Sequence, residues 1–322
     1  MKKIIAVCVL LSLFVALPVF GAQFKNQKMS DQEFIDLIRN GTEEEIIDTI
    51  QEKEANVNAV NNHGNSALMF AVMKGYVKAV NALINAGADI NAKSPRGGNA
   101  LVWAAGNGHS EIINILLQKG MDVNYKDNDG WTPIMFAAKN GHADAVNTLI
   151  KAGADINAKD NNGESALLGA AEYGYLDVVN LLIKASADVN AEDNIGENVL
   201  MCAAKNGHAD VVDVLIKAGA DVNFEDDIKR TALMRAAKSG EDTATVILLI
   251  EAGAKDLIDT EGKNALILAA ENGQAEIIME LLKAGSDANI RDKLGKRAVD
   301  YARSNPKLLG SDALKRLEQL SR

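Results

Sequence analysis

Histidine is the first side chain here that could do chemistry. The chain contains four histidines, and three of them, His109, His142 and His208, each follow a glycine at spacings of 33 and 66 residues. Such regular spacing places these three in equivalent positions of separate structural units, too far apart to share a metal ion or a proton. We therefore expect them to have structural roles, and we expect His63 to be exposed.

Two other motifs match reactive or metal-binding sites only in part. Cys202 falls within an apolar helical segment, where a buried thiol is inert. The run Asp127-Asn128-Asp129-Gly130 has the polar composition of a calcium loop. Alignment of Gly130 with the invariant glycine of that loop puts Phe136 where a carboxylate is required. No phosphate loop, zinc spacing or nucleophile elbow is present, so we expect no enzymatic activity, no cofactor and no metal.

A fixed period of 33 residues organises the chain. It is visible at eight positions that could each begin a helix: Ser66, Asn99, Thr132, Ser165, Asn198, Thr231, Asn264 and Arg297. Seven of the eight are Ser, Thr or Asn, which cap the free amide groups of a helix start. Glycines recur in most units two residues before and nine residues after this cap, where we expect positive φ. The period predicts one supersecondary unit copied along the chain.

The unit that begins at Asp127 shows how each copy should fold. Thr132 is a suitable helix cap, and Pro133 suits the first helical position. This short helix ends at Gly141, and a second helix follows that buries one apolar face of Val146, Leu149 and Ile150. Gly153 can adopt the left-handed conformation that closes the second helix. The segment that leads to the next unit is expected to be extended chain with a polar turn.

This unit resembles the ankyrin repeat. In that family a turn, a helix that opens Thr-Pro-Leu-His-x-Ala, a Gly-His and a second helix are followed by Gly-Ala-Asp-Val-Asn. Here the closing element recurs as Gly-Ala-Asp-Ile-Asn or Gly-Ala-Asp-Val-Asn at 87–91, 153–157 and 219–223, and the resemblance covers about residues 56–302. It implies an all-α solenoid of stacked helix-turn-helix units with short β-turn fingers. We expect seven full repeats with a capping unit at each end.

The chain departs from the family pattern at several positions. Apolar residues replace the motif histidine, so we expect apolar packing instead of its hydrogen bond between repeats; they are Met69, Val102, Met135, Leu168, Met201, Met234 and Ile267. Ser186 and Lys229 replace glycines of the closing element and of the turn. In the unit at 226–258 the second helix is expected to be bulged or extended by one residue and the next finger to be stunted. Neutral drift explains this irregularity more simply than a functional kink.

The two ends of the chain predict export and capping. Lys2 and Lys3 precede an apolar run over residues 4–20, as in a bacterial signal peptide; an uncleaved membrane anchor is the alternative. We expect a signal peptide at 1–22, a linker at 23–29, N-terminal capping helices at 30–60, repeats at 61–291 and a C-terminal capping unit at 292–322. The mature protein would be periplasmic or secreted. It would retain one cysteine, Cys202, and so could form no internal disulfide.

Charge and resemblance together indicate what the protein binds. The net charge of −10 disfavours nucleic acid and anionic lipid, which need a basic surface. The resemblance implies a monomeric, protein-binding scaffold without stable membrane insertion after signal cleavage. Ankyrin ligands usually contact finger tips and the concave face of the first helices. By position in the repeat this implies Asn128, Asp129, Trp131, Asn161, Asn162, Glu164, Asn194, Ile195 and Glu197 on the fingers, and Lys139, Asn140, Glu172 and Tyr173 on the helices.

Two features of this surface could select a partner. Trp131 stands where other repeats have small or charged residues, so it is either an exposed interface anchor or folded over the neighbouring finger. Acids on the middle fingers, such as Asp127, Asp160 and Asp193, precede bases on later fingers, which would align a partner of opposite charge order. Alternative functions are a specific inhibitor or protector of one periplasmic enzyme and a secreted effector that acts on host proteins.

Overall fold

The computed structural model describes residues 28–321, which form α-helices in pairs. The first helix of each pair is here called the inner helix: α2 (Asp31–Asn40), α4 (Ala67–Lys74), α6 (Ala100–Gly106), α8 (Pro133–Lys139), α10 (Ala166–Glu172), α12 (Val199–Lys205), α14 (Ala232–Ser239), α16 (Ala265–Asn272) and α18 (Ala298–Ser304). The second is the outer helix: α3 (Glu43–Gln51), α5 (Val77–Asn85), α7 (Ser110–Gln118), α9 (Ala143–Lys151), α11 (Leu176–Lys184), α13 (Ala209–Lys217), α15 (Thr243–Glu251), α17 (Ala275–Lys283) and α19 (Asp312–Leu320). A 3-10 turn, η1 (Pro306–Leu308), joins the last pair.

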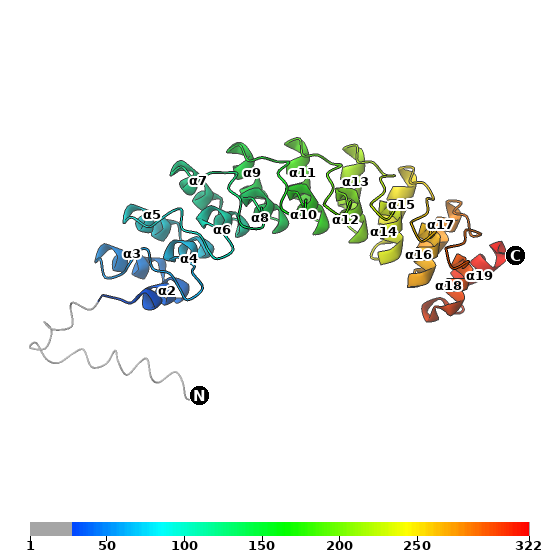
Figure 1. Ribbon diagram of the computed structural model, residues 1–322, viewed down its shortest axis with the longest axis horizontal. Helices are drawn as coiled ribbons and strands as arrows, with labels where there is room; N and C mark the ends of the chain where they lie inside the picture. The colour runs from blue at the N-terminus through cyan, green and yellow to red at the C-terminus, as the bar shows by residue number, and fades with distance from the viewer. Residues whose placement is uncertain (1–27, 322) are drawn as a thin grey trace, which may run out of the picture.

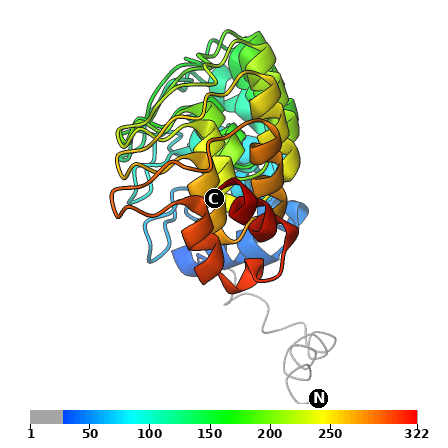
Figure 2. The ribbon, with the colours of Figure 1, turned by 90° about the vertical axis from the view of Figure 1, so that its right-hand side faces the viewer.

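The helix pairs stack side by side into a curved array. Outer helices lie on the convex side and inner helices on the concave side (Figure 1). Seen along the stack, the loops that join successive pairs project together to one side as a row of fingers (Figure 2). Within residues 28–321 the extended chain amounts to two isolated β-bridges, Val60–Ser66 and Glu192–Asn198. The prediction of an all-α solenoid with short fingers is confirmed.

One continuous apolar core runs through the stack between the two helix layers. Outer helices contribute branched side chains such as Val146 and Leu149, which are fully buried. Inner helices contribute alanines such as Ala137 and Ala138, also fully buried. Because alanine has a short side chain, neighbouring inner helices pack closely, which leaves their remaining face for the concave surface.

The expected helix caps form at most of the repeated positions. Ser66, Asn99, Ser165, Asn198, Thr231 and Asn264 each accept a hydrogen bond from the backbone amide three residues later. Thr132 has the extended backbone of a cap, but its hydroxyl is buried without a partner and Met135 N–H donates to the Thr132 carbonyl instead. At the last of these positions, the backbone amide of Arg297 donates to the carboxylate of Asp300. Thr132 is thus the N-cap residue with Pro133 at the first helical position, as expected, but its hydroxyl makes no capping hydrogen bond.

Most fingers are closed by one acid or amide side chain, whereas Ser94 begins a finger that is held by backbone bonds. In the finger that begins at Asp127, Oδ1 of that residue accepts from the amides of Asp129 and Trp131, at 3.0 and 2.8 Å. The equivalent oxygens of Asp160, Asp193, Asp226, Asp259 and Asp292 do the same in their fingers. A carboxylate that accepts two amides is part of the turn. Asp127, Asp160 and Asp193, three of the acids in the predicted charge order, each use one carboxylate oxygen to close their own finger.

Adjacent fingers are joined by a ladder of backbone hydrogen bonds. Amides of Asn128, Asn161, Asn194, Thr260 and Lys293 donate to the tip carbonyls of Arg96, Asp129, Asn162, Ile228 and Glu261. Within the described residues two bonds of this ladder are missing: Pro95 has no N–H to donate to the first finger, and the bond from Asp227 to Ile195 is absent. From residue 96 onward the backbone ladder therefore ties the fingers into two groups, one on each side of the Asp227 position.

A second ladder explains the histidines. Nε2 of His109, His142 and His208 lies 3.2, 3.0 and 3.0 Å from the carbonyl oxygens of Met73, Gly106 and Glu172 in the preceding unit. Gln274 and Asn305 make the equivalent bond with side-chain amides. The structural role predicted for these three histidines is confirmed. Apolar residues at the motif-histidine positions are buried, as expected.

The irregular unit at 226–258 differs from its prediction. Helix α15 has nine residues, like α13, and the extra residue lies in the loop before it, where Asp242 caps the helix. The missing residue lies between Gly253 and Asp259, while the finger closed by Asp259 keeps both of its amide bonds. The expected bulged helix and stunted finger are wrong, because the cap and the finger turn fix the ends of their elements and loops absorb the change.

Ser186 and Lys229 adopt positive φ, 67° and 59°, as their places in the repeat require. The predicted signal peptide and most of the linker lie outside the described residues. Among the helices that are described, none combines the length and hydrophobicity of a membrane span.

Candidate functional site: a groove between the fingers and the inner helices

Three positions in every repeat face the groove between the fingers and the inner helices. The finger row contains Asn65, Gly98, Trp131, Glu164, Glu197, Arg230, Lys263 and Lys296. The mid-helix row contains Phe70, Trp103, Phe136, Gly169, Cys202, Arg235, Leu268 and Tyr301. The helix-end row contains Met73, Gly106, Lys139, Glu172, Lys205, Lys238, Glu271 and Ser304. The side chains in these rows decide what the groove presents at each point along the stack.

In the N-terminal half the groove opens into a cavity of about 840 Å³. Trp103, Trp131 and Phe136 provide its aromatic walls, and the finger tips His63, Arg96 and Asp129 form its rim. A volume of this size lies within the range of ligand-binding pockets, which combine apolar walls with a few polar groups.

Two glycines create this cavity. Gly98 in the finger row and Gly106 in the helix-end row stand where other repeats have long or bulky side chains. Neither has positive φ, and a Cβ atom at Gly106 would meet its neighbours no closer than 3.6 Å. The backbone angles therefore do not require glycine at either position, although a Cβ atom at Gly98 would lie 3.3 Å from Oγ of Ser94, which would have to shift slightly. What the two glycines do is leave Trp103 and Phe136 uncovered.

Trp131 is held by its neighbours at the end of the cavity. Its ring lies 5.0 Å from the ring of Phe136 in the same repeat. Nζ of Lys139 lies 4.7 Å from the Trp131 ring centre and 5.8 Å from that of Tyr173. The same ammonium forms an ion pair with Glu164 at 3.8 Å. Trp131 is thus half-buried, lines the cavity and also borders Glu164 and Ser165 of the next repeat.

Burial changes the acidity of Glu164. Its pKa is raised because desolvation disfavours the carboxylate, and nearby Lys139 opposes that effect. The ammonium of Lys139 is therefore held in the groove wall between two aromatic rings and this carboxylate.

The C-terminal half of the groove is filled by charged side chains that pair with one another. Arg235 in the mid-helix row contacts Asp226 at 2.6 Å and Glu197 at 3.6 Å. Glu197 also pairs with Lys205 at 3.6 Å, and Arg230 pairs with Asp259 at 3.2 Å. Since the carboxylates of Asp226 and Asp259 are almost fully buried, these pairs are part of the wall.

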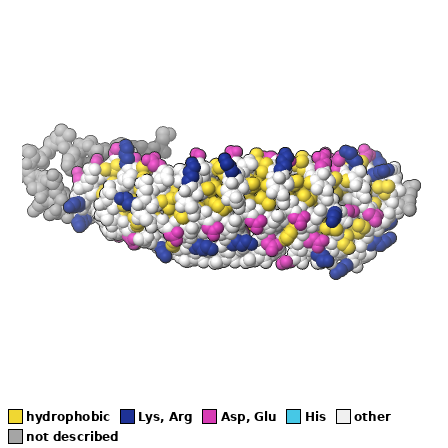
Figure 3. Space-filling model, turned by 90° about the horizontal axis from the view of Figure 1, so that it is seen from above, with side chains coloured by type: hydrophobic (Ala, Val, Ile, Leu, Met, Phe, Trp, Pro, Cys, Tyr) yellow, Lys and Arg dark blue, Asp and Glu magenta, His cyan; other side chains and the backbone are white. Residues whose placement is uncertain are grey.

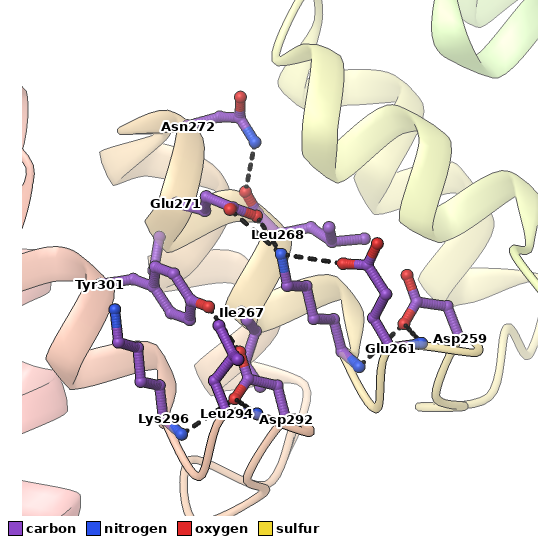
Figure 4. A network of polar contacts seen from close by, with 12 residues as sticks. Asp259, Glu261, Ile267, Leu268, Glu271, Asn272, Asp292, Leu294, Lys296 and Tyr301 are labelled. Atoms are coloured by element: carbon purple, nitrogen blue, oxygen red, sulfur yellow. Dashed lines mark hydrogen bonds and ion pairs between the residues drawn. The ribbon is translucent and has the colours of Figure 1, made fainter.

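The next repeats continue this pattern, and Figure 4 shows Glu261, Glu271 and Tyr301 in the resulting network of polar contacts. Nζ of Lys263 bonds Glu271 at 2.9 Å and Glu261 at 3.2 Å, and lies 5.4 Å from the Tyr301 ring centre. Although burial opposes its charge, hydrogen bonds to these two carboxylates raise the pKa of Lys263. The Tyr301 hydroxyl donates to Asp292, which raises the pKa of Tyr301 to about 12.

A family model for ankyrin repeats, which spans three copies of the repeat, matches this chain five times, at residues 34–94, 92–160, 158–226, 200–292 and 233–315. The chain belongs to the ankyrin repeat family. A comparison with curated proteins returns no match. Ankyrin repeats generally mediate protein–protein interaction, and proteins built from them are typically non-enzymatic scaffolds. The chemistry of the groove must therefore be read from its own residues.

Four of the ankyrin positions predicted to bind a partner line the cavity. They are Asp129, Trp131, Lys139 and Asn140. Asn140 also donates from its side chain to the Gly106 carbonyl at 2.8 Å. Glu164 and Tyr173 lie beside this group through their contacts with Lys139, and Glu172 follows one residue before Tyr173. The structure thus brings most of the predicted helix positions to one end of the groove.

The remaining predicted positions serve the fingers or lie apart from the cavity. Side-chain amides of Asn128, Asn161 and Asn194 donate to carbonyls of the preceding finger, at 3.2, 3.2 and 3.0 Å. Glu197 is buried and paired with Lys205 and Arg235. Asn162 and Ile195 lie exposed on finger tips. The three amides and Glu197 are therefore committed to the fold.

Sequence reasoning did not select Trp103, Phe136 or Arg96 as site residues. The signal was present in the repeat alignment, because Gly98 and Gly106 break two rows of larger residues side by side. Only the structure shows that both rows border the same space. Cys202, in the mid-helix row, is buried, and desolvation raises the pKa of its thiol; this agrees with an inert side chain.

Proposed function

We propose that this ankyrin repeat protein binds a partner protein through the N-terminal half of its groove. The observation that supports this is the cavity opened by Gly98 and Gly106, where aromatic side chains are accessible. Trp, Tyr and Arg are enriched among the few residues that contribute most of the binding energy at protein interfaces. In the C-terminal half the equivalent positions are occupied by charges that already have partners.

The convex surface offers less to a partner. Seen from the outer helices, hydrophobic side chains lie among Lys, Arg, Asp and Glu side chains (Figure 3). The isoleucines that recur there, such as Ile150, Ile183 and Ile216, are half-buried against the core. This face is convex and mixed in charge, so it lacks the enclosed aromatic surface that interface anchors require.

Filling the cavity tests this function. The variant Gly98→Glu/Gly106→Lys copies residues found at equivalent positions of other repeats, so it should fold normally. Affinity purification followed by mass spectrometry should recover the partner with the wild-type protein and lose it with the variant. The control Asn85→Glu/Gln118→Lys makes the same charge changes at exposed ends of outer helices. Equal recovery of the partner by the filled variant would contradict the proposal.

We also infer that the protein is exported and acts in the periplasm or outside the cell. The basis is the N-terminal sequence, in which two lysines precede an apolar run at residues 4–20. Fractionated cells should contain a mature form shortened by about 22 residues, measurable by intact mass. Full-length protein in the cytoplasmic fraction alone would exclude export.

A further inference from the structure

The groove carries a charge order that the ion pairs do not cancel. On the N-terminal side, Arg96 is an exposed base that lines the cavity, and Lys74 is an exposed base in the preceding repeat, at the position equivalent to the lining residue Asn107. On the other side, Asp129 is an exposed acid and Glu172 a half-buried one. Within residues 28–321 none of these four side chains takes part in an ion pair.

The charges between and beyond these groups are already matched. Lys139 is paired with Glu164, and Asp127 accepts two backbone amides. Past Glu172, the carboxylate of Glu197 is held by Lys205 and Arg235. In the direction of the stack, the unmatched groups therefore follow the order base, aromatic cavity, acid.

We propose that the groove binds an extended segment of the partner in which an acidic residue, an aromatic or long aliphatic residue and a basic residue follow in that order along the stack. This rests on the function proposed above and specifies its ligand. The acid would face Lys74 and Arg96, the apolar side chain would enter between Trp103 and Phe136, and the base would face Asp129 and Glu172. Charge complementarity of this kind fixes the register of a bound segment.

Repeat spacing sets the interval between these three residues. Helix layers pack about 8–10 Å apart, and an extended chain advances about 3.3 Å per residue. Side chains about three residues apart in the segment therefore reach successive repeats. The apolar residue would be the central anchor, with charges on each side at the edge of the cavity.

Two amide side chains favour an extended segment over a helix. Asn107 and Asn140 both line the cavity, and their NH₂ groups already donate to the carbonyls of Trp103 and Gly106. Each keeps its Oδ1 as an acceptor. An extended backbone has free N–H groups to donate to these oxygens, whereas the N–H groups of a helix interior are occupied.

Peptide selection tests the ligand directly. A phage library of random linear 12-residue peptides would be selected on the purified protein. We expect enriched sequences with one aromatic or long aliphatic residue, an acid about three residues to one side and a base about three residues to the other. Synthetic copies should bind the Gly98→Glu/Gly106→Lys variant about tenfold more weakly, or worse.

Reversing one end of the groove separates the parts of the proposal. Selection on Asp129→Lys/Glu172→Lys should replace the base by a second acid and keep the apolar anchor. The control Glu111→Lys/Glu251→Lys has the same net charge change on outer helices and should select the original pattern. Enrichment of the same base by Asp129→Lys/Glu172→Lys, or of no sequence by the wild type, would overturn the assigned ligand.

These outcomes differ from failure of the proposed function. If the ligand pattern is wrong but the filled variant still loses the natural partner, the groove remains the binding site. If selected peptides bind the filled variant as tightly as the wild type, the cavity itself is not the site.

Discussion

Repeats 94–159 and repeats 226–291 share one backbone plan but use it differently. In the first pair, Gly98 and Gly106 leave aromatic walls uncovered. In the second pair, Arg235 and Lys263 occupy the groove and pair with carboxylates of their own and neighbouring repeats. The comparison teaches that a solenoid can assign stability and binding to different stretches, because each repeat contacts only its neighbours.

The largest effect should come from breaking the paired half. Arg235→Ala leaves the buried Asp226 carboxylate without its partner and should lower the free energy of unfolding by about 3 kcal/mol. Urea denaturation followed by circular dichroism measures this. Lys238→Ala, on the same helix and exposed, should change it by less than about 0.5 kcal/mol. Similar losses in both variants would show that the pair adds nothing specific.

An arginine placed to pair with Asp160, as Arg235 pairs with Asp226, should stabilise the protein. Oδ2 of Asp160 is buried without a hydrogen bond. Gly169 follows Asp160 at the same spacing as Arg235 follows Asp226, the carboxylate with which it pairs. Gly169→Arg should raise the unfolding free energy by about 2 kcal/mol, from helix propensity and a charged hydrogen bond. Gly169→Ala should give only the first part, about 1 kcal/mol. Urea denaturation that finds the arginine variant no more stable than the alanine variant would refute the pairing.

The irregular finger of the paired half should accept glycine. Lys229 has φ of 59°, a conformation that costs a side-chain residue about 1–2 kcal/mol. Lys229→Gly should therefore raise the free energy of unfolding by about 1 kcal/mol, measured by thermal and urea melts. The exposed control Lys293→Gly, whose φ is not positive, should be neutral or destabilising. Stabilisation by the control alone would contradict the strain.

The smallest effect concerns alkaline pH. Folding raises the pKa of Tyr301 from 10.0 to about 12 through its hydrogen bond to Asp292, so the protonated phenol favours the folded state. This contribution is complete below pH 10 and is lost as the pH rises from 10 to about 12. Tyr301→Phe should melt at a lower temperature than wild type at pH 8, and the gap should narrow by pH 11. A constant gap would exclude this linkage.

Much of the fold follows from the repeat period, and the reasons are local. The caps at Ser66 and Asn99, the positive φ of Ser186 and the structural histidines all depend on position within one unit and its neighbour. The predicted position of a helix end was wrong where a side chain outside the repeat pattern caps the helix. Asp242 caps α15 and displaces the extra residue into the loop, which no count of residues between glycines reveals.

The site was less accessible to sequence reasoning. The row containing Gly98 was visible, but its effect depends on Gly106 in another row facing the same space. Asp160 and Asp193 look like surface acids in sequence, yet each carboxylate closes its own turn. Free and committed charges cannot be distinguished without the distances between them, so the usable charge order of the groove emerges only from the structure.

The missing rung between Asp227 and Ile195 has a mechanical consequence. Between Arg96 and Lys293, every other pair of adjacent fingers is joined by a backbone hydrogen bond in addition to the packing of the helices. At this joint that hydrogen bond is absent. Bending of the arch should concentrate there, since no backbone hydrogen bond ties these two finger tips and only side-chain contacts, such as the Glu197–Arg235 ion pair, cross the joint. We therefore expect the repeats before this joint and the repeats after it to move as two stiffer segments. A partner bound to the first segment would leave the second free to move.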